Sequence, residues 1–120
     1  MSIRREDVDA GRIDFSDGTE PGAPPIEPIH PGAILREDWI EPLGLSVYQL
    51  ARSLGVERSR LNEIVHGRRA ITADTALRLA RYFGTDAQSW MNLQARYDLE
   101  VALREAGRRI EEEVQPRAAA

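Results

Sequence analysis

Between positions 50 and 64, apolar and small residues follow the spacing of two short helices joined by a sharp corner. These residues are Leu50, Ala51, Leu54, Gly55, Val56, Leu61 and Ile64. Leu50 and Leu54 lie one helical turn apart, and Leu61 and Ile64 share the inner face of the second helix. Gly55 stands at the corner, where a positive φ costs other residues about 1 kcal/mol or more. The pattern is typical of a helix-turn-helix that reads DNA; the alternative is an ordinary helical hairpin with no DNA role.

Positive charge is concentrated in the part of the chain that holds this pattern. Residues 46 to 81 carry seven Arg against three acidic residues, a net charge of +4. Residues 1 to 45 carry four Arg against ten acidic residues (−6), and residues 82 to 120 carry five against seven (−2), which together give the −4 of the whole chain. A basic region at the helix-turn-helix is what neutralisation of DNA phosphates requires.

The composition argues against an enzyme, a metal site and a membrane segment. The chain has no Cys, so disulfides, thiolate ligands and Cys nucleophiles are absent. The two histidines, His30 and His66, lie far apart in the sequence, which disfavours a metal site or a His-based triad. The sequence shows no phosphate-binding glycine loop, signal peptide or run of about 20 apolar residues. We expect a cytoplasmic, non-enzymatic protein with no cofactor, bound metal or small-molecule substrate.

Residues 1–29 are predicted to be an acidic, flexible leader rather than a folded unit. Five of the seven prolines fall between positions 21 and 31, which excludes a helix there and favours extended conformations. The leader holds three Arg against seven acidic residues. Residues 12–16 alternate polar and apolar side chains, a pattern typical of an edge strand that forms only when a partner supplies its neighbour.

From Pro31 onward the chain is predicted to form an all-α domain of five helices over residues 30–98. The expected helices span about 32–40, 47–54, 58–66 and 73–83, with a fifth beginning after Asp86 and carrying Trp90, Leu93 and Tyr97 on one face. Ser46, Thr72 and Asp86 are suited to cap helix starts, and Gly67 and Gly84 to end helices. The expected buried stripe of the fourth helix consists of Ala76, Leu77, Ala80 and Phe83.

Residues 99–114 are predicted to form an additional amphipathic helix, followed by a short tail over 115–120. Its apolar stripe consists of Leu99, Leu103, Ala106, Ile110 and Val114. An apolar stripe on a terminal helix outside the compact core indicates contact between subunits. The predicted dimer residues are Tyr97, Leu99, Leu103 and Ile110. The alternative is that this helix packs back on its own domain.

The first turn of the second helix in a helix-turn-helix points into the major groove, while later residues and the following loop meet the DNA backbone. The residues predicted to contact base edges are Arg58, Ser59, Arg60 and Asn62. Arg binds guanine in a fork and Asn pairs with adenine, whereas Glu63 flanks the set. The residues predicted to contact phosphates are Ser46, Tyr48, Arg52, His66, Arg68 and Arg69. For the arginines, the alternative is a solvated surface.

Several motifs along the chain resemble those of the HigA family, the XRE-type antitoxins of bacterial toxin-antitoxin modules. The segments that carry the resemblance are His30–Asp38, Glu41–Ser46, Ala70–Thr72, Thr75–Ala80, Phe83–Thr85, Trp90–Gln94 and Tyr97–Leu99. They cover about residues 30 to 100 in the family's order. Glu57 departs from the pattern, because a small residue or proline commonly opens the recognition helix.

The resemblance implies a lambda-repressor-like helix-turn-helix domain that forms a homodimer and binds double-stranded operator DNA in its own promoter. It further implies repression of the operon and neutralisation of a HigB toxin, an mRNA-cleaving ribonuclease of the RelE type. By position, Arg58, Ser59, Arg60 and Asn62 correspond to the family's groove-facing residues. Two alternatives remain: a stand-alone XRE repressor without a toxin, and a protein-interaction module whose helix-turn-helix no longer binds DNA.

The acidic leader suggests how a toxin is recognised. A ribonuclease presents basic surface to RNA, so an acidic segment complements it. We expect Ile13 and Phe15 to anchor the leader on the toxin, with Asp14 and Asp17 supplying charge. The alternatives are a solubilising tail, or a toxin that docks on the first helix or the carboxy-terminal helix.

Overall fold

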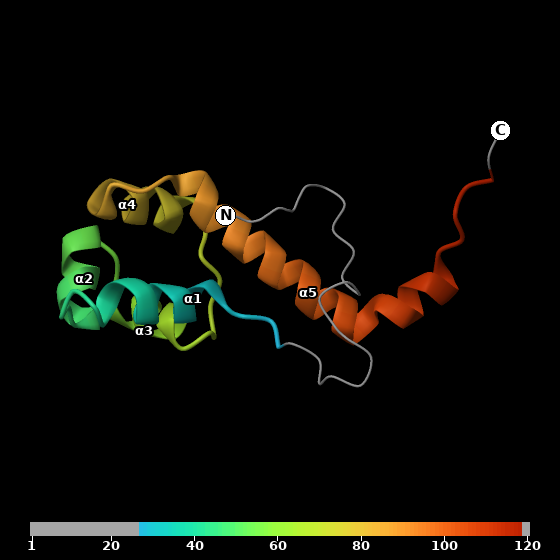
Figure 1. Cartoon of the computed structure of the whole chain (residues 1–120), viewed down its shortest axis with the longest axis horizontal. Helices are drawn as coiled ribbons and strands as arrows, with labels where there is room; N and C mark the ends of the chain where they lie inside the picture. Colours follow the sequence, from blue (N-terminus) through green and yellow to red (C-terminus); the bar gives the residue numbers. More distant parts are fainter. Residues whose placement is uncertain (1–26, 119–120) are drawn as a thin grey trace.

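A computed structural model of the chain describes residues 27–118, and within that range every regular element is a helix. The elements are α1 (Pro31–Ile34), the π-helical segment η1 (Leu35–Ile40), α2 (Val47–Leu54), α3 (Arg58–Val65), α4 (Ala73–Phe83) and α5 (Ala87–Glu113). Figure 1 shows α1 to α4 gathered at one end of the molecule, with α5 running out from them toward the C-terminus. The predicted all-α fold is confirmed, as are the bounds of α2 and α4.

Local side-chain hydrogen bonds explain where the helices begin and end. Ser46 and Gln49 form a reciprocal capping box at the start of α2, with both N···O distances at 3.0 Å. Thr72 caps α4 and Asp86 caps α5 through their side-chain oxygens. At the other end of α2, Gly55 adopts φ 74°, the left-handed conformation predicted for the corner.

The core lies between the short helices. Its buried members include Leu35, Leu50, Leu61, Ile64, Ile71 and Leu79, all at most 1% exposed. Beside it, the Trp39 ring lies 4.8 Å from the Phe83 ring and 6.2 Å from the Trp90 ring, which joins η1, α4 and α5. The indole N–H of Trp90 donates to the Thr85 hydroxyl at 2.9 Å. The helix-turn-helix of α2 and α3 is therefore packed against the rest of the helical domain.

The buried stripe of α4 differs from the predicted one. Thr75, Ala76 and Leu79 face the core, whereas Leu77 is 63% exposed. The prediction for Leu77 was wrong because one turn of helix separates Thr75 from Leu79, and Leu77 falls between them on the opposite side.

The fifth helix and the additional C-terminal helix are one continuous element. The expected break near position 98 is absent because Tyr97, Asp98 and Leu99 include no helix-breaking residue, and α5 also runs through Gly107. The first helix shows a smaller difference, since from Leu35 it widens to a π-helix in which the Glu41 N–H donates to the Arg36 carbonyl at 2.9 Å. No helix described within residues 27–118 has the length and apolarity needed to cross a membrane.

Candidate nucleic-acid interface

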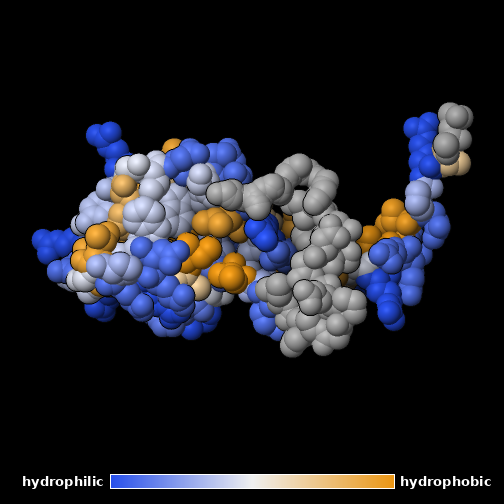
Figure 2. Space-filling model, in the orientation of Figure 1, coloured by the Kyte–Doolittle hydropathy of each residue, from blue (hydrophilic) through white to orange (hydrophobic). Residues whose placement is uncertain are grey.

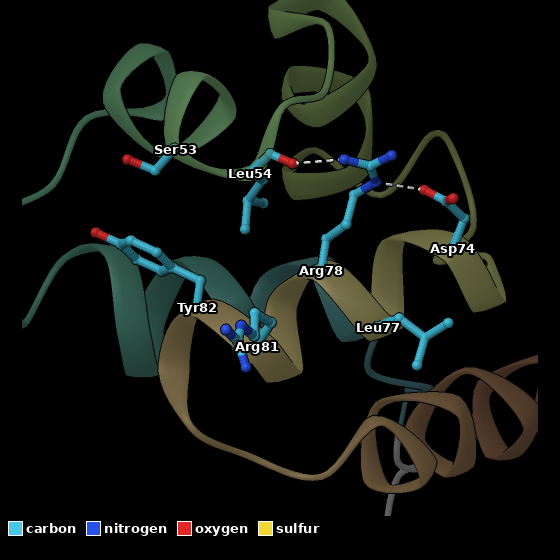
Figure 3. A pocket seen from close by; sticks show the side chains of 7 residues that line it. All are labelled: Ser53, Leu54, Asp74, Leu77, Arg78, Arg81 and Tyr82. Carbon is cyan, nitrogen blue, oxygen red and sulfur yellow. Dashed lines mark hydrogen bonds and ion pairs between the residues drawn. The ribbon is translucent and has the colours of Figure 1, made fainter.

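A side chain of α4, Arg78, binds the corner between α2 and α3. Arg78 donates from Nη1 to the carbonyl oxygen of Leu54 at 2.9 Å and from Nε to Asp74 at 2.6 Å. Figure 3 shows its guanidinium reaching from α4 to the end of α2, beside a groove that Ser53 and Tyr82 also line. A cation at the last carbonyls of α2 complements the helix dipole. Arg78 was not among the residues predicted from the sequence, and its spacing from Asp74 was the available signal.

The predicted base-contacting residues lie together at the start of α3. Arg58, Ser59 and Arg60 are exposed in the first turn, and Asn62 is half-buried one turn further on. The guanidinium carbon of Arg58 lies 5.8 Å from the centre of the exposed Tyr48 ring, a cation–π arrangement that links α3 to the start of α2. This contact restricts the Arg58 side chain before any ligand binds.

Glu57 is the N-cap residue of α3, and its side chain makes no capping hydrogen bond. The amide groups in the first turn of α3 therefore keep their hydrogen-bonding capacity. These amide N–H groups lie at the positive end of the helix dipole. An anionic ligand is favoured in front of this turn, although the Glu57 carboxylate opposes it.

The predicted phosphate-contacting residues fall into two groups on either side of α3. At the start of α2, Ser46, Tyr48 and Arg52 are exposed, although the Ser46 hydroxyl already accepts the Gln49 N–H as the helix cap. After α3, the exposed residues of the turn are His66, Arg68 and Arg69. The first group precedes the first turn of α3 in the sequence, and the second group follows its last turn.

The side chains after α3 are partly fixed by α3 itself. The His66 ring Nδ1 lies 2.8 Å from the Asn62 carbonyl oxygen, and Arg69 Nε donates to Glu63 at 2.7 Å. Glu63, which was expected to flank the base-contacting set, is thus the partner of Arg69. The ion pair is exposed, so it orders Arg69 more than it stabilises the fold.

Two residues that contact the segment after α3 were not predicted from the sequence as site residues. Gln94 of α5 is 5% exposed; its amide oxygen accepts the Ile71 N–H at 2.8 Å and its amide nitrogen donates to Asp98 at 2.9 Å. His30 caps α1 and its ring packs edge-on against Tyr97 at 4.8 Å. Burial lowers the pKa of His30 below its usual 6.5, while Asp98 opposes that shift. The available signal in the sequence was that Gln94 shares a helix face with Trp90 and Tyr97.

Three of the four predicted dimer residues are exposed, and the fourth is half-buried. Leu99, Leu103 and Ile110 are exposed on α5, whereas Tyr97 is half-buried against His30. Figure 2 shows hydrophobic surface on the distal part of α5. Within the described residues, the stripe of Leu99, Leu103 and Ile110 does not pack back on the helical domain. The predicted toxin-binding residues Ile13, Asp14, Phe15 and Asp17 lie outside the described residues.

The buried corner, the exposed Arg-bearing first turn and the flanking polar residues define a helix-turn-helix protein of the DNA-binding class. A family model described as helix-turn-helix matches residues 37–90. Virulence-associated protein I of Dichelobacter nodosus is 64% identical over 74 residues, which cover 62% of this chain and 68% of that protein.

Two solved structures match the fold over their full length. A HigA-family addiction module antidote protein from Coxiella burnetii is 48% identical with a TM-score of 0.73, covering 77% of this chain and 100% of that one. Pseudomonas aeruginosa antitoxin HigA, solved with the higBA promoter, is 47% identical with a TM-score of 0.75 and the same coverage. The chain belongs to the HigA family of helix-turn-helix antitoxins, a non-enzymatic family, which confirms the resemblance read from its motifs.

Proposed function

We propose that this protein binds operator DNA as a homodimer, represses its own operon and neutralises a HigB-like, mRNA-cleaving toxin in the cytoplasm. The observation that carries the DNA part is the exposed first turn of α3, with Arg58, Ser59 and Arg60 held on a buried helix-turn-helix corner. The promoter-bound HigA of Pseudomonas aeruginosa supports it, because 47% identity extends over the whole of that chain.

In the proposed complex, α3 lies in the major groove and its first turn reads base edges. Arg58 binds guanine through its guanidinium fork, and Asn62 pairs with adenine. Arg52, Arg68 and Arg69 neutralise phosphates on either side and fix the register of α3 without reading sequence. The phosphate contacts thus supply affinity through charge, and the base contacts of α3 supply selectivity.

We propose that the homodimer forms through the exposed apolar stripe of α5. Leu99, Leu103 and Ile110 recur at helical spacing and remain exposed in the single chain. A two-fold axis at this stripe presents the same surface from both subunits. Operator recognition by this dimer requires the two copies of α3 to lie about 34 Å apart, the distance between half-sites one duplex turn apart.

Toxin neutralisation is proposed to use the acidic leader, with Ile13 and Phe15 as apolar anchors and Asp14 and Asp17 facing basic toxin surface. The support is the leader's composition, three Arg against seven acidic residues over positions 1 to 29. Deleting residues 1–26 tests this and keeps Glu27, which contacts Arg104 of α5 at 3.4 Å. We expect the truncated protein to lose affinity for the co-encoded ribonuclease while keeping its DNA affinity; unchanged toxin affinity would contradict the proposal.

The DNA function is tested by fluorescence anisotropy with the protein's own upstream DNA and a scrambled duplex of equal length. We expect the upstream DNA to bind about 10³-fold or more tightly, the range of specific over non-specific binding. Equal affinity for both duplexes would favour a protein-interaction module instead. Specific binding without a ribonuclease gene beside the operon would favour a stand-alone repressor.

A further inference from the structure

His30 occupies a position between the turn after α3 and the body of α5. On one side, a Cβ added to Gly67 would lie 3.7 Å from His30 Cγ, so the ring packs against this turn. On the other side, the Tyr97 ring meets it edge-on at 4.8 Å. The imidazole is thus a spacer between the phosphate-contacting turn and the long helix.

The ring is also held by hydrogen bonding in its neutral form. The Gly32 N–H donates to His30 Nδ1 at 2.8 Å, which caps α1. Because Nδ1 accepts, the neutral ring carries its proton on Nε2. The Arg69 backbone faces the ring and, with the Asp98 carboxylate, favours the protonated form, while burial favours the neutral form and dominates. Among residues 27–118, the titratable side chains that face the ring are Asp98 and Tyr97, both on α5.

A second contact ties the same turn to α5. Two residues beyond Arg69, the Ile71 N–H donates to Gln94, whose amide nitrogen binds Asp98. The residues between Gly67 and Ile71 are therefore fixed to α5 at both ends, by His30 at the first and by Gln94 at the last. Arg68 and Arg69 project from this span.

We propose that His30 is a proton-sensitive positioning residue that holds the Gly67–Arg69 turn against α5 and so sets the strength with which this turn binds the DNA backbone. This inference rests on the proposed function of the turn. Protonation places an N–H on Nδ1, which can no longer accept the Gly32 N–H. The cap of α1 is lost, the ring moves, and Gly67 loses its packing surface.

The test compares two proteins across pH with the operator duplex in an anisotropy titration. His66→Gln is the common background, which leaves His30 as the one imidazole of the chain. His30→Asn in that background keeps a capping oxygen but cannot titrate near neutral pH. Circular dichroism at each pH checks that both proteins remain helical.

We expect the operator Kd of His66→Gln to rise several-fold from about pH 7 to about pH 5. Because binding is linked to a single proton on His30, the Kd can rise by at most about tenfold for each pH unit. The salt slope should fall by about one for each phosphate that the turn no longer neutralises. The His30→Asn double variant should change less than about twofold over the same range. Parallel pH profiles and equal salt slopes in the two proteins would overturn the inference.

A measurement that needs no substitution at His30 complements this comparison. NMR titration of the His30 ring in His66→Gln, free and bound to the operator, should give a lower pKa in the complex, since DNA binding selects the neutral ring. An unchanged pKa would overturn the inference. Failure of the wild-type protein to bind its operator at neutral pH would instead contradict the proposed function on which the inference rests.

Discussion

The carbonyl oxygen of Ile64, near the end of α3, lies where a side chain at position 32 would begin. A Cβ built on Gly32 stands 1.7 Å from that oxygen and 2.6 Å from its carbonyl carbon. Both partners are backbone, so neither can turn away as a side chain would. The absence of a side chain at Gly32 therefore sets how closely α1 packs on the recognition helix.

Gly32→Ala is expected to destabilise the fold by about 3 kcal/mol or more, because α1 and α3 must separate to admit the methyl group. Urea unfolding followed by circular dichroism measures the effect. Gly44→Ala is the matched control: Gly44 has φ 68° but no neighbour within 4 Å of a built Cβ, so only backbone strain of about 1 kcal/mol applies. Equal losses of stability in the two variants would show that the packing against Ile64 is relaxed in solution.

Gln94→Leu should cost about 2 kcal/mol, because the buried Ile71 N–H loses its acceptor. Gln88→Leu provides the comparison on the same helix, since Gln88 is exposed and bonds Asn92 at 2.9 Å on the surface. That variant should change stability by less than about 0.5 kcal/mol. Denaturant midpoints that fall by the same amount would remove the assigned role of Gln94.

Stability is expected to fall as the pH drops below about 6.5, the ordinary pKa of His. The folded pKa of His30 is lowered, so below 6.5 the unfolded chain binds more protons than the native one. The contribution is thus fully present above pH 6.5 and is lost as the pH falls through the folded pKa. Thermal unfolding of the wild type and His30→Asn across this window checks it; identical pH slopes would contradict the burial of a neutral ring.

Leu99→Asp should weaken the dimer by about tenfold or more, because it places a charge in the proposed apolar interface. Leu77→Asp is a close control: Leu77 and Leu99 are both 63% exposed, and Leu77 lies on α4, off the stripe. Sedimentation equilibrium gives both dimer dissociation constants. The α5 interface would be contradicted if Leu77→Asp weakened the dimer as much as Leu99→Asp.

Local features of the sequence were sufficient to predict where most helices begin and end. Ser46, Thr72 and Asp86 cap helices through groups two or three residues away, so their roles follow from short-range spacing. The corner at Gly55 was predictable for the same reason. The exposed residues at the start of α3 followed from the helix-turn-helix pattern once its register was fixed.

Other features depend on contacts between distant parts of the chain. His30 meets Tyr97 and Gln94 binds Ile71 only because α1 and α5 flank the same turn, which no local pattern shows. In α4, Leu77 and Leu79 are equally apolar, and packing decides which is buried. The continuity of α5 could be predicted only from the lack of a helix-breaking residue near position 98. Such a lack is weaker evidence for a helix boundary or its absence than a capping residue is.

The placement of α3 in the major groove is tested most directly by comparing Arg58→Ala with Arg68→Ala in titrations of the operator and a scrambled duplex at several salt concentrations. We predict that Arg58→Ala costs about 1 to 3 kcal/mol on the operator alone and reduces discrimination, since Arg58 reads a base. Arg68→Ala should weaken both duplexes alike and lower the salt slope by about one. Indistinguishable behaviour of the two variants would contradict the placement of α3 in the major groove.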